Sequence, residues 1–130
     1  MRAALRDAGL AASDVDYLNM HATATVKNDA MESLAIDRVF AAGVPVSGTK
    51  PLSGHALGAA GALELAFCWL SLQHGQLPPH VWDGAADPEM PALDWITKGR
   101  RFARKAGRAC MSNSFAFGGS NVSLLVGDAR

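Results

Sequence analysis

The sequence contains little cysteine, which excludes a fold held together by disulfides. Cys68 and Cys110 are the two cysteines in 130 residues, and neither belongs to a C-x-x-C metal-binding spacing. Both lie in apolar runs, which is typical of reduced core thiols in a cytoplasmic protein. We therefore expect a cytoplasmic location, no disulfide and no metal site.

The sequence also lacks an excess of positive or negative charge and a long hydrophobic run. Twelve basic and twelve acidic side chains cancel, so no global field favours nucleic acid or an anionic membrane surface. Residues 57–70 are the most apolar stretch, with Glu64 as their one charge. They are shorter than the roughly 18 to 20 residues that span a bilayer. We expect no membrane insertion, and we expect residues 57–70 to form a helix buried on all sides.

Glycine positions and hydrophobic periodicity predict that strands and helices alternate along the first part of the chain. Residues 1–8 look like the last turns of a helix that Gly9 ends, which suggests a fragment of a longer chain. The elements expected next are a strand at 14–20, a helix that begins at Asn28 or Asp29 and ends at Gly43, a strand at 44–48, and the apolar helix, which ends at Gly75. This alternation is typical of parallel strands in an α/β layered fold.

The second part of the chain predicts loops and a hairpin. Prolines at 78, 79 and 88 predict an ordered segment without regular secondary structure that runs across the surface. A short strand is expected to follow it at 92–97. Residues 108–113 and 121–126 predict two antiparallel strands. Six basic residues in 98–108 could attract an acidic carrier, although a solvated surface is the commoner use of such a run. His74 and His80 are expected at the surface, and Trp69, Trp82 and Trp95 in packed positions.

Two histidines occupy positions where α/β folds bind ligands. His21 ends the first strand, and His55 follows Lys50 in a turn before the apolar helix, where the helix dipole favours a neutral imidazole that donates a hydrogen bond. Lys50 lies among small apolar residues and needs an anion, for which Glu32 is one candidate. The alternatives are ordinary hydrogen bonding for each histidine and a capping-box role for Glu32.

The segment 112–120 contains a pair of glycines that permits two interpretations. Gly118 and Gly119 expose backbone N–H groups that could form an oxyanion hole, although a tight turn is the more common use of such a pair. Phe115 and Phe117 precede them, separated by one alanine.

Five segments together resemble one family over nearly the whole chain. They are HATAT at 21–25, NDAMES at 28–33, GTKPLSGHALGAAGALE at 48–64, LPP at 77–79 and SNSFAFGGSN at 112–121. In this order they are similar to the carboxy-terminal portion of the β-ketoacyl-acyl carrier protein synthases. The similarity is greatest to the elongating condensing enzymes of type II fatty acid synthesis, and NDAMES also resembles relatives from aryl polyene pigment clusters.

The resemblance implies a fold and a reaction. Residues 1–130 would form one domain, the carboxy-terminal half of a thiolase-type layered α-β-α-β-α fold, in a homodimer or in a heterodimer with a related subunit. The implied enzyme is an acyltransferase of lipid metabolism. A cysteine in the first half takes an acyl chain from acyl carrier protein, and two histidines assist the decarboxylation of malonyl carrier protein. The carbanion attacks the acyl thioester and gives 3-oxoacyl-acyl carrier protein. The substrates travel on a phosphopantetheine arm, so no separate cofactor is expected.

The resemblance also implies roles for individual residues. His21 and His55 would hydrogen-bond the malonyl thioester carbonyl, Lys50 would orient the site, and Glu32 would be the acidic partner of Lys50. The implied substrate-binding residues are Thr23 and Thr25, which meet the pantetheine arm, and Phe115, Phe117, Gly118 and Gly119, with Phe117 as the gate beside the nucleophile.

The chain departs from the family pattern in three ways. The segment with the nucleophilic cysteine is absent, because Cys68 and Cys110 lie in a predicted helix and strand, so we expect the chain alone to be inactive. Ala22 and Ala116 replace glycines that are usual in these loops, which narrows the allowed backbone. The alternatives to a synthase are a non-catalytic subunit like a chain-length factor and a carrier-protein-binding module. A thiolase is disfavoured, because no cysteine stands in the final glycine loop.

Overall fold

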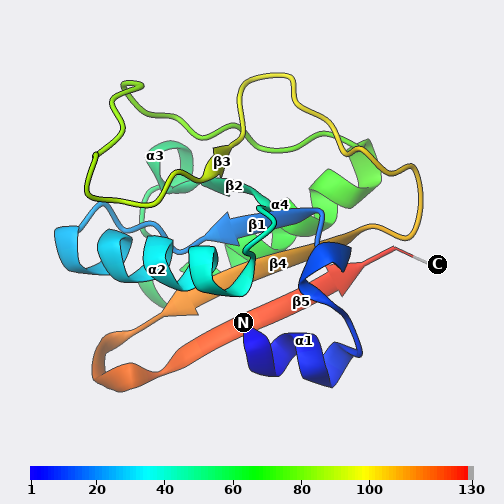
Figure 1. Cartoon of the computed structure of the whole chain (residues 1–130), viewed down its shortest axis with the longest axis horizontal. Coiled ribbons are helices and arrows are strands. Elements are labelled where there is room, and N and C mark those ends of the chain that lie inside the picture. The colour runs from blue at the N-terminus through cyan, green and yellow to red at the C-terminus, as the bar shows by residue number, and fades with distance from the viewer. Residues whose placement is uncertain (129–130) are drawn as a thin grey trace.

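A five-stranded mixed sheet organises the chain in the computed structural model, which describes residues 1–128 with every side chain except that of Phe117. β1 is central and pairs in parallel with β2 and β4, while β3 pairs in parallel with β2 and β5 runs antiparallel to β4 (Figure 1). The strands are β1 (Tyr17–Met20), β2 (Pro45–Gly48), β3 (Asp94–Trp95), β4 (Ala109–Phe115) and β5 (Asn121–Gly127).

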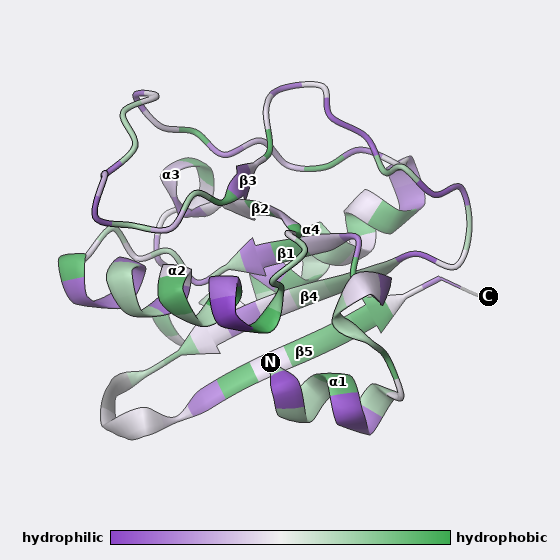
Figure 2. Ribbon diagram, viewed as in Figure 1, coloured by the Kyte–Doolittle hydropathy of each residue, from purple (hydrophilic) through white to green (hydrophobic). Residues whose placement is uncertain are grey.

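Helices cover both faces of this sheet. The α-helices are α1 (Arg2–Ala8), α2 (Val26–Val39), α3 (Lys50–Ser53) and α4 (Ala60–His74), and short 3-10 turns lie at Ala12–Asp14, Leu57–Ala59 and Phe117–Gly119. α1 and α2 lie on one face and α4 on the other (Figure 1). Hydrophilic and hydrophobic residues mix along α1 and α2 (Figure 2), as expected for helices with one side in water.

Alternation along the strands gives each face its own core. Leu18 and Met20 of β1 pack with Ile36 and Phe40 from the α2 region. Tyr17 of β1 points the opposite way and packs in a second cluster, together with Cys68 and Leu72 of α4, Leu77, Ile96 and Cys110. The alternation of strands and helices, the parallel pairing and the antiparallel final hairpin predicted from the sequence are confirmed.

Several predicted boundaries are wrong. The first strand begins at Tyr17, because residues 12–14 form a 3-10 turn in which Asp14 Oδ2 accepts a hydrogen bond from Ala11 N at 2.9 Å. The following helix begins at Val26, with Thr25 at its N-cap, and not at Asn28 or Asp29. It ends at Val39, before Gly43. The strand expected at 92–97 is confined to Asp94–Trp95.

The apolar helix is buried on one side only. α4 runs from Ala60 to His74 and ends at Gly75, which adopts the left-handed conformation as expected. Leu63, Trp69 and Leu70 are 39%, 53% and 40% exposed, so the prediction of burial on all sides is wrong, as is that of a packed Trp69. Within residues 1–128 a single sheet face covers this helix. No helix in this range has the length and apolar composition that a membrane crossing needs.

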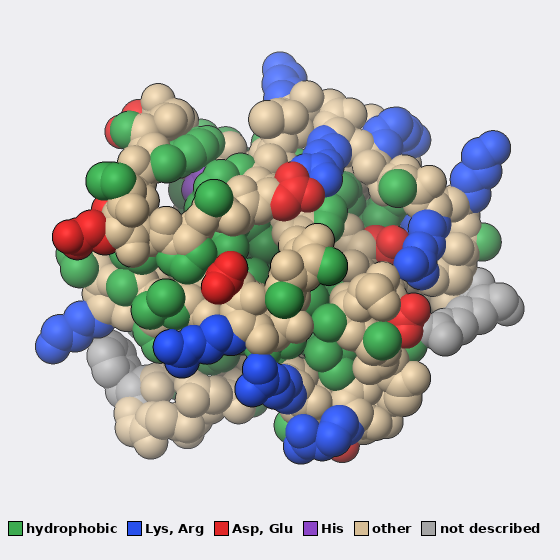
Figure 3. Space-filling view, in the orientation of Figure 1, with side chains coloured by type: hydrophobic (Ala, Val, Ile, Leu, Met, Phe, Trp, Pro, Cys, Tyr) green, Lys and Arg blue, Asp and Glu red, His purple; other side chains and the backbone are tan. Residues whose placement is uncertain are grey.

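The long segment after α4 is irregular, as predicted, and His80 within it is half-buried rather than fully exposed. Gly48 N donates to His80 Nδ1 at 3.1 Å, and the imidazole stacks on Trp95 with ring centroids 4.3 Å apart. Three of the six basic residues in the run form ion pairs among the described residues, namely Arg100 with Asp94, Arg104 with Asp16 and Arg108 with Asp128. Lys and Arg side chains are spread over the face seen in Figure 3, without a dominant patch.

Candidate active site

The carboxyl ends of three parallel strands bring the candidate residues together. His21 follows β1 directly, Lys50 lies two residues after β2, and Phe115 ends β4. Parallel neighbours end at the same edge of a sheet, which is where α/β folds place their ligands. β1 and α2 thus position His21, while α3 holds Lys50 in its first turn.

Lys50 is a buried cation with three partners. Its Nζ forms an ion pair with Glu64 Oε1, donates to the backbone oxygen of His21, and lies 3.3 Å from His21 Nδ1. Lys50 and Glu64 are 7% and 1% exposed. Sequence reasoning was right that this lysine needs an anion and wrong about which one, because Glu64 occupies the position assigned to Glu32.

Glu64 is the functional candidate that sequence reasoning missed. Burial raises the pKa of its carboxyl, while the hydrogen bond and charge of Lys50 act in the opposite direction. The signal was present in the sequence, since a single charge within residues 57–70 must find a partner when its helix packs on a core.

Glu32 binds backbone N–H groups instead. Its Oε1 accepts from His21 N at 2.9 Å and from Asn113 Nδ2 at 3.1 Å, and its Oε2 accepts from Ala22 N at 2.8 Å. The side chain is fully buried, and burial raises its pKa while these hydrogen bonds lower it. Both earlier roles for Glu32, the partner of Lys50 and the capping box, are therefore wrong. Glu32 fixes the turn that carries His21.

The hydrogen bonds define how the two imidazoles are protonated. The Lys50 ammonium can only donate, so His21 Nδ1 accepts and the ring hydrogen lies on Nε2. Burial, followed by the charges of Lys50 and His55, lowers the pKa of His21 to about 4. His55 Nδ1 accepts from Leu57 N at 3.2 Å, which also places the hydrogen of a neutral His55 on Nε2. The rings are perpendicular, with centroids 5.5 Å apart. The arrangement places two imidazole rings next to each other, each with its neutral-form N–H on Nε2.

The remaining predicted site residues lie around this pair or beyond it. The Phe115 ring is 5.9 Å from the His21 ring, in an edge-to-face arrangement. Thr23 Oγ1 and Thr25 Oγ1 are 3.0 Å apart on the turn after His21. Gly118 and Gly119 have φ of 78° and 83°, which fits the tight-turn interpretation. The side chain of Phe117 lies outside the described part of the structure, so its gating role stays a prediction.

The two alanines that replace family glycines differ in strain. Ala22 has φ of 39°, in the left-handed region, whereas Ala116 has φ of −123°, which any residue adopts. The Ala22 methyl is accommodated because Gly48 faces it, and a Cβ at position 48 would lie 2.6 Å from it.

Neither cysteine is placed as a nucleophile. Both are fully buried, and Cys68 Sγ donates to Met111 O at 3.8 Å. The hydrogen bond with Cys68, followed by burial, raises the pKa of Cys110, so it remains a thiol. No group of three or more His, Cys, Asp or Glu side chains in residues 1–128 has an arrangement that could hold a metal ion.

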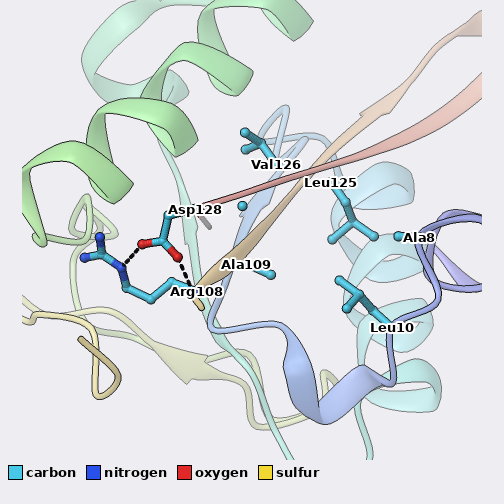
Figure 4. A pocket seen from close by; sticks show the side chains of 8 residues that line it. Ala8, Leu10, Arg108, Ala109, Leu125, Val126 and Asp128 are labelled. Carbon is cyan, nitrogen blue, oxygen red and sulfur yellow. Dashed lines mark hydrogen bonds and ion pairs between the residues drawn. The ribbon is translucent and has the colours of Figure 1, made fainter. Parts of the chain in front are cut away.

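One cavity lies away from this site. It measures about 430 Å³ and is lined by Ala8 and Leu10 on one side and by β5 on the other, with the Arg108–Asp128 ion pair at its edge (Figure 4). Ala109, at the start of β4, also lines it. Phe115 ends the same strand, roughly 20 Å away at about 3.4 Å per residue. The cavity is therefore separate from the histidines.

Comparison with known proteins identifies the family. Residues 1–82 match the family described as Beta-ketoacyl synthase, C-terminal domain. The chain belongs to the beta-ketoacyl synthase family. The chain is 46% identical over 127 residues to Nodulation protein E of Rhizobium meliloti, covering 95% of this chain and 31% of that protein. It is 41% identical over 132 residues to the mitochondrial 3-oxoacyl-[acyl-carrier-protein] synthase of Arabidopsis thaliana, covering 96% and 28%.

Solved structures of ketosynthases share the fold. A ketosynthase in complex with its chain length factor from Xenorhabdus doucetiae superposes with a TM-score of 0.91 at 42% identity, covering 99% of this chain and 32% of that one. A beta-ketoacyl synthase from Burkholderia phymatum gives a TM-score of 0.90 at 39% identity, covering 100% and 31%. The prediction of the carboxy-terminal part of a thiolase-type α/β fold is confirmed.

The beta-ketoacyl synthase chain spans about a third of the length of the curated relatives it matches. Activity, substrates and partners of the whole protein are therefore proposals, and the extent of one domain over residues 1–130 stays a prediction.

Proposed function

We propose that this chain supplies the two-histidine part of a 3-oxoacyl-acyl carrier protein synthase. The reaction is the decarboxylative Claisen condensation of malonyl-acyl carrier protein with an enzyme-bound acyl chain. The nucleophilic cysteine comes from outside this chain, because Cys68 and Cys110 are buried. Acyl carrier protein delivers both substrates, and the working unit is a homodimer or a heterodimer with a related subunit.

The single observation that carries this proposal is the pair of Nε2–H donors on His21 and His55. When the malonyl thioester loses carbon dioxide, the bond to the carboxylate breaks and its electron pair moves toward the thioester carbonyl. Negative charge grows on that oxygen, where two preorganised donors stabilise it. The carbanion carbon then bonds to the carbonyl carbon of the acyl-enzyme, and the cysteine thiolate leaves.

Lys50 and Glu64 support this chemistry without any need to touch the substrate. The Lys50 ammonium donates hydrogen bonds to His21 Nδ1 and to the backbone oxygen of His21. The imidazole ring is therefore held in one orientation, and its Nδ1 is not free to accept a proton. A neutral imidazole keeps its remaining N–H as a donor over the physiological pH range, since its pKa is about 4. Glu64 neutralises the buried charge that makes this possible.

A second candidate is a non-catalytic subunit like a chain-length factor. The observation in its favour is that a ketosynthase relative of similar fold forms a complex with its chain length factor. The retained histidine pair and the buried Lys50–Glu64 ion pair favour the catalytic role, because a subunit without chemistry has no need of either.

The test is malonyl decarboxylation by the natural protein purified from its source cell. Malonyl-acyl carrier protein is supplied, and carbon dioxide release and 3-oxoacyl product are measured in the wild type, His21→Ala and His55→Ala. We expect each substitution to lower kcat by about 100- to 10,000-fold, the range for lost transition-state donors.

His74→Ala is the matched control, because His74 is exposed at the far end of α4. It should retain the wild-type rate. A wild-type protein without decarboxylase activity, isolated together with an active synthase subunit, would favour the chain-length-factor alternative. Full activity in His21→Ala would refute the role given to that histidine.

A further inference from the structure

A buried amide on β4 connects the final hairpin to the turn that carries His21. Asn113 is fully buried and lies two residues before Phe115. Its Nδ2 donates to Glu32 Oε1 at 3.1 Å, and its Oδ1 accepts from Ser123 Oγ of β5 at 2.8 Å. The amide plane is thus fixed from both ends, by α2 on one side and by β5 on the other.

The Asn113 bond determines how the Glu32 carboxylate is oriented. Oε1 already accepts from His21 N, and Oε2 accepts from Ala22 N. The donor from Asn113 is the one side-chain partner among the described residues that Glu32 has besides these two backbone groups. A carboxylate with fixed rotation can hold two consecutive backbone N–H groups, one on each oxygen.

The turn after His21 contains backbone angles that are unfavourable for L-amino acids. Ala22 has φ of 39° and Ala24 has φ of 59°, so the segment after His21 persists because surrounding bonds impose it. A loss of the Glu32 orientation would release this turn. The His21 backbone oxygen, which Lys50 binds, would then move with it.

We propose that Asn113 is a positioning residue for the condensation. It orients Glu32 and, through Glu32, sets the position of the His21 ring relative to His55 and Lys50. This inference rests on the proposed function. It also links two substrate-side segments, since Asn113 and Phe115 share β4 while Phe115 contacts the His21 ring.

The simpler interpretation is that Asn113 only satisfies a buried carboxylate. Two substitutions separate the interpretations. Asn113→Ala removes the donor, and Asn113→Asp keeps the shape but places a second acceptor against Glu32. In Asn113→Asp/Glu32→Gln the hydrogen bond between the two side chains returns in reverse, but the amide nitrogen introduced at position 32 then faces His21 N and cannot accept from it. Asn28→Ala is the matched control, because its amide bonds to Asp29 and does not touch Glu32.

The experiment uses the natural protein purified from its source cell, with malonyl-acyl carrier protein as substrate. We expect Asn113→Ala to lower kcat by about 10- to 100-fold, the effect of one lost hydrogen bond to a charged group. KM should change little. Asn113→Asp should lose more, and the exchanged double variant should not recover kcat, because the bond between the side chains returns while His21 N loses its acceptor. A purely structural role would lower the unfolding midpoint without this order of kcat values.

A second readout does not depend on activity. Amide hydrogen exchange at His21 and Ala22 should accelerate in Asn113→Asp relative to the wild type and to Asn28→Ala. Unchanged exchange, or wild-type kcat in both Asn113 variants, would overturn the positioning role. Faster exchange in a protein whose wild type shows no decarboxylation would overturn the proposed function while leaving the structural link in place.

Discussion

The two faces of the central sheet are built from the same strands and differ in chemistry. Toward α1 and α2, β1 presents Leu18 and Met20, which pack in an apolar cluster. Toward α4, the same strand presents Tyr17 and Asn19, whose side chains hydrogen-bond each other, and Tyr17 OH also meets Ser47 Oγ at 2.9 Å. We call the first the apolar face, although Glu32 and Asn113 hydrogen-bond each other at its edge, and the second the polar face, because Tyr17 and Asn19 are hydrogen-bonded there.

The polar face has an energetic cost that the apolar face must offset. Asn19 Oδ1 and Glu64 Oε2 have no hydrogen-bond partner among the described residues, and each such buried oxygen costs about 1–3 kcal/mol. A site that places a lysine and two histidines at the sheet edge therefore depends on apolar packing elsewhere in the fold, most of it in the cluster toward α1 and α2.

Breaking the buried ion pair on the polar face should have the largest effect. Glu64→Ala leaves the Lys50 ammonium buried without its anion, which costs about 3–5 kcal/mol of the free energy of unfolding. Urea denaturation of the natural protein measures it. Asp94→Ala, which removes the exposed ion pair with Arg100, is the control and should cost about 0–1 kcal/mol. Equal losses in both variants would contradict the cost assigned to leaving a buried charge without its partner.

Truncation on the apolar face should affect stability without affecting catalysis. Ile36 of α2 is 1% exposed, and Ile36→Ala should cost about 2–5 kcal/mol. Leu34→Ala, on the same helix but 44% exposed, should cost within about 0.5 kcal/mol. Denaturant midpoints and kcat are measured together. A large fall in kcat at temperatures where Ile36→Ala remains folded would show that the packing of α2 also sets the position of Glu32 and, through it, of His21.

Sequence patterns were sufficient for the apolar face and less so for the polar one. Periodicity and glycine positions predicted the alternation of strands and helices, because this follows from local backbone preferences. The partner of Lys50 was misassigned, since the family resemblance implied Glu32, whereas the pairing with Glu64 depends on how α4 packs. The exposed side of α4 could not be predicted either, because composition does not say what lies against a helix.

The free energy of unfolding should depend on pH because the pKa of His21 is lowered in the folded protein. Its pKa is about 4 in the folded protein, against an ordinary value of 6.5, so between these values the unfolded state binds the extra proton. Stability is then fully present above pH 6.5 and falls with decreasing pH, by up to about 1.4 kcal/mol per pH unit. His21→Gln should lack this component, so the wild type should lose stability relative to the variant from pH 6.5 to 4. Parallel curves would contradict a buried, neutral His21.

The smallest expected effect lies in the turn that joins the two faces. Ala22 and Ala24 both have positive φ, and replacing either with glycine relieves strain of about 1 kcal/mol. Ala24 is exposed, so Ala24→Gly should show most of this gain. Ala22 packs against the apolar cluster, and Ala22→Gly loses that methyl contact, so its gain should be smaller or absent. The difference between the two unfolding free energies measures the packing at Ala22. A larger gain at Ala22 than at Ala24 would mean that the methyl is strained against Gly48 and makes no favourable contact with the core.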